Sequence, residues 1–466
     1  MPERLVVIGG DAAGMSAASQ ARKRRGADDL SIVAFERGRT TSYSACGIPY
    51  WIGNDVTSRD ALITRTPEEF RGKQDIDMRI RSDVQSIDLE RKTVRVHDLD
   101  AGRTYDEAYD QLMIATGSVP TRPPIDGIDA DGVYGVQTLD DGTDLREELD
   151  SGEVKHVVVV GGGYIGLEIA EATKSRGFEV TVVDMSETPI GTFDPDVGHF
   201  LADAVRGLGI ELILGDGAAR IETDRDGRVC SVHTSSGRVL PADLVVLGLG
   251  VRPNVALAKN AGIPLGTSGG IAVDQRMRTQ VEGVWAAGDC VESIHRLSGQ
   301  RVVVALGTHA NKQGRVAGIN LGGGYATFAG VIGTAITKIC EVEAARTGLS
   351  EREARESGYE FVTAVVDSTT RAGYYPGAQP IRLKLLAERR SGRLLGAQIV
   401  GKDTAAKRID VLAATIWNGM TVDEILGMDL SYAPPFSPVW DPVLIAARKA
   451  QDAVEADISS TIATGR

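Results

Sequence analysis

Two glycine-rich turns, each placed between an apolar strand and a helix of small residues, constrain the fold of this chain most. The first is Gly9-Gly10-Asp11-Ala12-Ala13-Gly14, and the second is Gly161-Gly162-Gly163-Tyr164-Ile165-Gly166. Each follows an apolar run, at 5–8 and 157–160. Such a turn brings backbone N–H groups and the positive end of a helix against a pyrophosphate. The pattern predicts two Rossmann-like dinucleotide-binding units and an α/β fold.

An acidic residue closes the second strand of each unit, Glu36 in the first and Asp184 in the second. A carboxylate at this position accepts hydrogen bonds from a ribose. Asp184 would repel a 2′-phosphate, and the next three residues contain no arginine to pair with one. We therefore expect NADH rather than NADPH in the second unit. Asp11 replaces the middle glycine of the usual pattern, so the first unit matches that pattern less closely.

Two such sites imply two different dinucleotides, most simply FAD and a nicotinamide nucleotide. Each unit is followed by an apolar strand that ends in a turn of small residues, at Thr116-Gly117 and at Gly250. A third strand ends in Ala286-Ala287-Gly288-Asp289, whose acid is placed to hold the ribitol hydroxyls of a flavin. The two units thus share one pattern of elements, and a strand expected to contact the flavin follows the second unit in the chain. The sequence therefore predicts that the NAD domain is inserted in the FAD domain.

From about residue 325 the pattern changes to alternating strands followed by a helix over 404–418, which is typical of an α+β domain. The expected organisation is an FAD-binding domain at 1–117 and 251–324, an NAD(H)-binding domain at 118–250, a C-terminal domain at 325–450 and a flexible tail at 451–466.

Composition excludes several classes of protein. Lys and Arg number 51 against 64 Asp and Glu, a net charge of −13, which argues against nucleic acid and anionic membrane as partners. The four cysteines show no CxxC spacing, so neither a disulfide framework nor a structural metal site is expected. No apolar run is long enough for a membrane span, and the N-terminal one is too short for a signal peptide. We expect a cytoplasmic protein.

Together these motifs resemble the flavin-dependent pyridine nucleotide–disulfide oxidoreductases, over roughly residues 1–450. The narrower resemblance is to the single-cysteine branch: coenzyme A-disulfide reductases, NADH-dependent persulfide reductases, and their NADH oxidase and peroxidase relatives. The segments that carry it are Gly9–Gly14, Ser42–Tyr50, Gly161–Glu168, Ala286–Asp289, Lys312–Arg315 and Tyr432–Pro435.

The resemblance implies that Cys46 is the redox residue. Gly47 and Pro49 predict a sharp entry into a helix, whose N-terminus would stabilise a thiolate beside an electron-poor flavin. Because the chain has no CxxxxC pair, the oxidised form must be a mixed disulfide with a small thiol, a persulfide or a sulfenic acid. The other cysteines, Cys230, Cys290 and Cys340, are expected to be small buried apolar side chains.

The resemblance also assigns roles to residues away from Cys46. Tyr164 matches the residue that covers the nicotinamide pocket, and Glu168 lies one helical turn further on. A homodimer would bring Tyr374 and Tyr432 of one subunit to Cys46 of the other as proton donors. The positions that match the coenzyme A arm are Gln20, Lys23, Ser42, Lys73 and His309.

Two features bear on the identity of the thiol. Lys23 belongs to a basic run, 22–25, that is also typical of a solvated helix face. Trp440 stands near a position where some coenzyme A-disulfide reductases carry lysine, and Ala45 replaces a polar neighbour of the cysteine. Both departures affect coenzyme A as the substrate more than they affect thiol chemistry.

Three functions are therefore weighed. The leading hypothesis is NADH-dependent reduction of low-molecular-weight disulfides or persulfides. The second is an NADH oxidase; an efficient peroxidase is disfavoured because the first glycine turn holds no histidine and none precedes His97. The third is an electron-transfer or redox-sensing flavoprotein that acts on a protein partner, with Cys46 as a switch.

Overall fold

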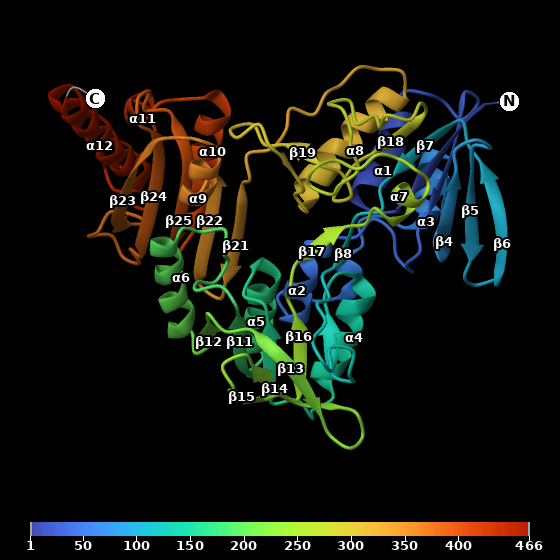
Figure 1. Ribbon diagram of the computed structural model, residues 1–466, viewed down its shortest axis with the longest axis horizontal. Helices are drawn as coiled ribbons and strands as arrows, with labels where there is room; N and C mark the ends of the chain where they lie inside the picture. The colour runs from blue at the N-terminus through green and yellow to red at the C-terminus, as the bar shows by residue number, and fades with distance from the viewer. Residues whose placement is uncertain (1, 465–466) are drawn as a thin grey trace.

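The computed structural model describes residues 2–464, which form three lobes, with the second unit lying between the first lobe and the C-terminal domain at the bottom of the view (Figure 1). The first lobe is built on a parallel sheet in the order β18-β7-β1-β2-β3. Its strands are β1 (Glu3–Ile8), β2 (Leu30–Phe35), β3 (Ile76–Arg79), β7 (Gln111–Ile114) and β18 (Val284–Ala286). A three-stranded antiparallel sheet extends this lobe: β4 (Ser82–Asp88), β5 (Thr93–Asp98) and β6 (Arg103–Ala108).

Helices α1 and α8 cover the first sheet and touch each other closely. A Cβ on Gly314 would lie 2.2 Å from the carbonyl oxygen of Ala13, and one on Gly318 would lie 2.3 Å from that of Ala17. Glycine is therefore required where the two helices meet. The helices of this lobe are α1 (Ala12–Arg22), α3 (Pro67–Gln74), α7 (Ala256–Asn260) and α8 (Gly307–Leu321), with the short strands β19 (Ser293–Ile294) and β20 (Arg301–Val302) nearby.

The second unit repeats this plan with the sheet order β12-β11-β10-β16-β9. The strands of this sheet are β9 (Val133–Gly135), β10 (His156–Val160), β11 (Glu179–Asp184), β12 (Glu211–Leu214) and β16 (Leu244–Leu247). The helices of the unit are α4 (Leu139–Asp150), α5 (Tyr164–Ser175) and α6 (Pro195–Gly207). A second, smaller sheet consists of β13 (Ala218–Thr223), β14 (Val229–Thr234) and β15 (Val239–Pro241).

The chain enters and leaves the second unit along one antiparallel pair, β8 (Ser118–Pro120) and β17 (Val251–Pro253). After β17 the chain returns to the first sheet, where β18 pairs with β7 in parallel. The expected insertion of one Rossmann-like unit in the other is thus confirmed, because a strand that follows the second unit completes the sheet of the first.

The C-terminal domain is an antiparallel sheet with helices on it, as expected from its alternating strands. The order β21-β22-β25-β24-β23 comprises β21 (Ala335–Ile339), β22 (Val342–Gly348), β23 (Phe361–Thr369), β24 (Pro380–Glu388) and β25 (Leu394–Gly401). The helical segments are η3 (Ala405–Arg408), α9 (Glu351–Glu356), α10 (Ile409–Asn418), α11 (Val422–Leu426) and α12 (Pro442–Thr464).

The residues expected to form a flexible tail, 451–466, are helical as far as the structure describes them. Residues 451–464 continue helix α12, and Val454 is buried against the core of the C-terminal domain. Within residues 451–459 the exposed side chains lie on the open face of a helix whose other face packs through Ala450 and Val454. No helix among the residues described is long and apolar enough to cross a membrane.

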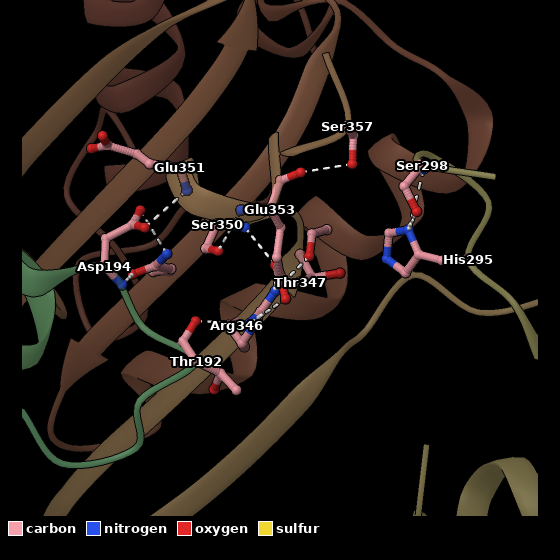
Figure 2. A network of polar contacts seen from close by, with 12 residues as sticks. Thr192, Asp194, His295, Ser298, Arg346, Thr347, Ser350, Glu351, Glu353 and Ser357 are labelled. Atoms are coloured by element: carbon pink, nitrogen blue, oxygen red, sulfur yellow. Dashed lines mark hydrogen bonds and ion pairs between the residues drawn. The ribbon is translucent and has the colours of Figure 1, made fainter. Parts of the chain in front are cut away.

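A buried polar network joins the second unit to the C-terminal domain (Figure 2). Asp194, on the loop before α6, accepts hydrogen bonds from the backbone N–H of Glu351 (2.9 Å) and from the Gln398 amide (2.8 Å). Arg346 donates to the Thr192 carbonyl oxygen (2.7 Å) and pairs with Glu353 (2.6 Å). Three of these contacts cross the interface between the second unit and the C-terminal domain, and the Arg346–Glu353 pair orients the arginine that makes one of them. The network therefore fixes the position of α6 relative to the antiparallel sheet.

Candidate active site

The first glycine turn has no room for side chains. Gly9 has φ +106°, and a Cβ there would lie 2.0 Å from the carbonyl oxygen of Ala115; a Cβ on Gly14 would lie equally close to that of Gly9. The Glu36 carboxylate accepts the backbone N–H of Gly10 (2.8 Å) with one oxygen and that of Gly38 (2.7 Å) with the other. The acid predicted at the end of β2 therefore lies directly against the turn.

The second glycine turn repeats these contacts. Gly161 has φ +107°, and Cβ atoms on Gly161 and Gly166 would lie within 2.4 Å of backbone oxygens. The Asp184 carboxylate accepts the backbone N–H groups of Gly162 and Ser186. The internal repeat read from the sequence thus extends to the contact between each acid and its turn.

The predicted residues at the strand ends meet beside the crossover between the two units. Asp289 accepts a hydrogen bond from the Ser118 hydroxyl (3.2 Å), and burial raises the pKa of its carboxyl. The Thr116 hydroxyl donates to the Asn254 carbonyl oxygen (2.6 Å). Gly117 and Gly250 both have positive φ, as the tight turns at either end of the crossover require.

Asp11 is half-buried immediately before α1, and its side chain does not cap that helix. Burial and the charge of Glu36 raise the pKa of Asp11 to about 7. Near neutral pH this carboxyl is therefore partly protonated, which reduces its repulsion of a phosphate beside the turn. The substitution at the middle glycine position is compatible with an anion-binding turn for this reason.

Cys46 lies in a short turn, η1 (Ala45–Gly47), that leads into the five-residue helix α2 (Ile48–Ile52). The segment before it is tied to the first glycine turn: the Ser42 N–H donates to the Gly10 carbonyl oxygen (3.0 Å), which also accepts from the Thr41 hydroxyl. Ser42 itself has φ +50°, a strained conformation for a residue with a side chain. These contacts fix the cysteine segment relative to the FAD-type turn.

Cys46 is exposed, and the protein around it does not favour the thiolate. Partial desolvation, followed by the charges of Glu168 and Asp289, raises the pKa of the Cys46 thiol. Desolvation and these carboxylates thus oppose the thiolate that the N-terminus of the short helix α2, together with a flavin, was expected to stabilise, and that expectation stays a prediction.

The remaining cysteines differ from one another. Cys290 is buried as expected, whereas Cys230 is exposed on β14 and Cys340 is half-buried in the turn between β21 and β22. The expectation of burial is thus wrong for Cys230, because its position faces outward on an edge sheet. All four cysteines are free.

Glu168 lies in the first turns of α5, and its carboxylate accepts a hydrogen bond from the Thr337 hydroxyl of β21 (2.9 Å). Burial raises the pKa of Glu168 to about 7, although the Thr337 hydrogen bond opposes this. Tyr164 begins the same helix, and its hydroxyl oxygen is buried beside Thr192. Ile165, between the glycines of the turn, is exposed.

A groove of about 370 Å³ lies beside the first glycine turn and brings together three of the predicted substrate positions. Gln20, Lys23 and Ser42 line it. Arg65 and Arg315, which sequence reasoning did not assign to the substrate, line it as well, and no acidic residue does. Arg315 could have been predicted, because it belongs to the Lys312–Arg315 segment that carries the family resemblance. No feature of the local sequence indicates that Arg65 lines the groove.

The other two predicted substrate positions do not line this groove. Lys73 is exposed and pairs with Glu69 one helical turn away (2.7 Å). His309 is half-buried against the Phe328 ring, with a buried Nδ1 atom, and burial lowers its pKa to about 4. The structure therefore groups Gln20, Lys23 and Ser42, and it leaves Lys73 and His309 apart from them.

Tyr374 and Tyr432 lie together on the open surface of the C-terminal domain. The loops that carry them are joined by a hydrogen bond from the Ala372 N–H to the Pro434 carbonyl oxygen (3.1 Å), and Tyr374 raises the pKa of the Tyr432 hydroxyl. Their neighbourhood is rich in exposed large side chains: Tyr374, Tyr375, Tyr432, Phe436, Val439 and Trp440. Neither tyrosine lines the groove on the first lobe.

The two glycine turns fit the dinucleotides expected of them. Each offers a turn whose first and last glycines leave no room for a Cβ, a helix N-terminus and an acid fixed at the adjacent strand end, which is the set that a pyrophosphate and a ribose require. In the first lobe Glu36, Asp289 and the 9–14 turn would hold FAD. In the second unit Asp184 and the 161–166 turn would hold a nicotinamide nucleotide.

Comparison with known proteins agrees with this geometry. Residues 3–314 match the model of the pyridine nucleotide-disulphide oxidoreductase family, and residues 334–442 match its dimerisation domain. The NAD(P)H coenzyme A polysulfide/persulfide reductase of Pyrococcus horikoshii is 39% identical over 449 residues, 96% of this chain and 98% of that protein. An NADH oxidase of Methanocaldococcus jannaschii is 36% identical over 448 residues, 96% of this chain and 98% of that protein.

Among solved structures, an NAD-dependent persulfide reductase from A. fulgidus superposes with a TM-score of 0.93 and 40% identity, over 97% of this chain and 84% of that one. The use of FAD and a pyridine nucleotide, expected from the two turns, is confirmed by the family. By sequence, by fold and by the dimerisation domain at its C-terminal end, the chain belongs to the pyridine nucleotide-disulphide oxidoreductase family.

Proposed function

We propose that this protein uses NADH to reduce low-molecular-weight disulfides or persulfides of the coenzyme A type at Cys46. The observation that carries the proposal is the anchoring of one lone cysteine segment to the first glycine turn through the Gly10 carbonyl oxygen. A sulfur fixed beside an FAD-type turn, with no second cysteine in its segment, suits electron transfer to a small sulfur substrate. The persulfide and polysulfide reductases among the relatives support the same chemistry.

In this scheme the Cys46 thiolate attacks one sulfur of a disulfide or persulfide, and the S–S bond breaks so that the other sulfur leaves as a thiol or, when the inner sulfur of a persulfide is attacked, as hydrosulfide. Bound FAD supplies the redox chemistry that carries an electron pair from NADH to the sulfur species left on Cys46. Glu36 would hold the ribose of FAD and Asp289 its ribitol, and Asp184 would position the NADH ribose. Tyr374 and Tyr432 of a second subunit protonate the first thiolate, which leaves when Cys46 attacks the substrate, and this makes the homodimer the active form.

The groove beside Ser42 is proposed to bind the phosphates of the thiol carrier. Lys23, Arg65 and Arg315 line it without an acidic residue, so its charge opposes that of the chain as a whole. Changing Arg65 or Arg315 to Gln should raise KM for coenzyme A persulfide and leave KM for inorganic polysulfide unchanged, because polysulfide carries no phosphate. An equal rise for both substrates would contradict a phosphate-binding role.

The central experiment is anaerobic NADH turnover with coenzyme A disulfide, coenzyme A persulfide, glutathione persulfide and polysulfide, compared side by side. Cys46→Ser should abolish turnover of all four while FAD absorbance is retained. Cys230→Ser is the matched control, since that thiol is exposed and lies on β14 of the second unit. Turnover that survives Cys46→Ser would contradict the mechanism.

An NADH oxidase is the second candidate, favoured by the relative of that name in M. jannaschii. The first glycine turn holds Asp11 and two alanines, with no group of histidine type to assist peroxide breakdown. Oxygen uptake measured beside persulfide turnover separates the two functions. A redox-sensing flavoprotein with a protein partner would show neither. Four free cysteines suit a reducing compartment, and we propose the cytoplasm.

A further inference from the structure

Helix α2, which follows Cys46, packs on helix α5 of the second unit. A Cβ on Gly53, at the end of α2, would lie 3.1 Å from the Cα of Ala172 on α5. Arg176, after α5, donates to the Ile52 carbonyl oxygen (3.3 Å). Ile48, Trp51 and Ile52 are buried in the core of the second unit, although they belong to the first lobe in sequence. The cysteine segment is thus mounted on the helix that carries Glu168.

Glu168 is also fixed from the opposite side by the C-terminal domain. Its carboxylate accepts the hydroxyl hydrogen of Thr337, which is 4% exposed, so the donor is desolvated and has a fixed position. One turn further along α5, Glu171 binds the Lys338 ammonium, the neighbour of Thr337 on β21. Strand β21 therefore binds two carboxylates on neighbouring turns of α5, those of Glu168 and Glu171.

The groups that face Glu168 come from several elements. Burial and then the charge of Glu168 raise the pKa of the Cys46 thiol on η1 and of the Tyr50 hydroxyl on α2, and no other charge raises either pKa as much. Glu171 of α5 adds a like charge, and Thr337 of β21 adds a hydrogen bond. The cation nearest along β21, Lys338, is already paired with Glu171. No cation pairs with Glu168 among the residues described, so a proton is the counter-charge available to it.

We propose that Glu168 stores the proton that the sulfur chemistry of Cys46 consumes, and that Thr337 is its positioning residue. The inference rests on the proposed function. Reduction of a disulfide follows RSSR + NADH + H⁺ → 2 RSH + NAD⁺. When the S–S bond between Cys46 and the bound thiol accepts an electron pair, it breaks and Cys46 keeps the thiolate. The departing RS⁻ takes the Glu168 proton and leaves as RSH, and water then reprotonates the carboxylate.

The direction of the pH effect follows from the contacts. Burial raises the pKa of Glu168 to about 7, so the protonated form is present below that pH and is lost as pH rises through it. Turnover should therefore fall on the alkaline side with an apparent pKa near 7. Glu168→Gln should remove this fall and lower the maximal rate by about 10²-fold, a typical loss for one proton donor.

Two further variants should shift the alkaline fall of the pH–turnover profile in opposite directions. Thr337→Val removes a hydrogen bond that lowers the pKa of Glu168, so the fall should shift to higher pH. Glu171→Gln removes a like charge that raises this pKa, so the fall should shift to lower pH. Thr337→Ser keeps a hydroxyl and should restore the wild-type position. A purely structural role of Thr337 would lower stability without this ordered pair of shifts.

A second readout does not depend on turnover. The pH dependence of the rate at which iodoacetamide alkylates Cys46, in holoprotein with oxidised FAD and with Cys46 first reduced to the free thiol, reports the pKa of that thiol when it is followed by mass spectrometry of the Cys46 peptide. Because the Glu168 charge raises that pKa, Glu168→Gln should lower it. The exposed Cys230 peptide is the internal control and should not change.

The outcomes separate this inference from the proposed function. If Cys46→Ser retains turnover, the proposed function fails whatever Glu168 does. If Cys46 is essential but Glu168→Gln keeps the wild-type pH profile and only raises KM for NADH, Glu168 is a nicotinamide-binding residue and the proton role is overturned. An unchanged alkylation profile in Glu168→Gln would overturn it as well.

Discussion

At the scale of single residues, the acids at the two strand ends are the most informative positions. Glu36 and Asp184 stand in the same relation to their glycine turns, each accepting a backbone N–H from the second glycine. The sequence predicted both residues, because a strand of fixed length places its last side chain at the edge of the sheet. It did not predict that Arg65 lines the groove beside Ser42, because that position depends on the fold of the loop before α3.

Asp184 gives the first prediction. Its carboxylate would accept a hydrogen bond from the ribose 2′-hydroxyl and repel a 2′-phosphate. Asp184→Ala should lower kcat/KM for NADH by about tenfold, the loss of roughly 1.4 kcal/mol of binding, and should raise the NADPH-to-NADH efficiency ratio. Steady-state kinetics with both nucleotides measures this. A wild-type ratio above one would contradict the role of Asp184.

At the scale of elements, the contact of α1 with α8 holds the first glycine turn in place. The two helices approach so closely that backbone oxygen atoms of α1 occupy the space of a side chain on Gly314 and Gly318. The sequence showed small residues in both helices without showing which pairs touch, since each helix presents several small faces. Only the crossing angle and register of the two helices select the pair.

Gly314 gives a prediction at this scale. Gly314→Ala places a methyl group 2.2 Å from the Ala13 carbonyl oxygen, which forces α8 away from α1. It should cost about 1–3 kcal/mol of stability and weaken FAD retention, measured as flavin absorbance after dialysis and as Tm.

Gly72→Ala is the matched control for Gly314→Ala. Gly72 lies within α3, and a Cβ there meets no atom within 4 Å. This change should be neutral or stabilise the protein by up to about 1 kcal/mol, because alanine is the better helix former. Equal destabilisation by the two changes would contradict the packing argument.

At the scale of the whole molecule, buried charges join the lobes. Lys384 on β24 is 1% exposed and binds Asp194, Asp196 and Glu351 at 2.7–3.2 Å. Burial opposes its charge, but hydrogen bonds to Asp196 and Glu351 raise the pKa of Lys384 above its ordinary value. The stability that this lysine contributes is therefore present at neutral pH and is lost only as pH rises through that raised pKa.

Lys384→Met should destabilise the chain by about 3–5 kcal/mol, because it leaves the Asp194 carboxylate buried without its cation. Lys407→Met provides the comparison: its pair with Asp410 is exposed, and its loss should cost less than about 1 kcal/mol. Thermal unfolding of the two variants measures the difference. Similar Tm values for the two variants would show that the buried Lys384 cluster contributes little to the stability of the fold.

The dimer gives the last prediction. If Tyr432 acts on the partner's cysteine, Cys46→Ser and Tyr432→Phe subunits should complement each other after mixing. A mixed dimer holds one intact site, so a 1:1 mixture should regain about a quarter of wild-type sites. Activity no greater than the average of the two parent variants would place the tyrosine outside the partner's site.

The sequence by itself determined the two nucleotide-binding units, their order of insertion and the α+β character of the C-terminal domain. Short local sequence patterns predict each of these features, because a glycine turn, an apolar run and an acid at a strand end each favour one local structure. The tertiary structure alone decided that α2 packs on α5 and that Glu168 meets Thr337, 169 residues away. Such contacts depend on how separate lobes are joined, and the free energy of burial that joins them leaves no local signature in the chain.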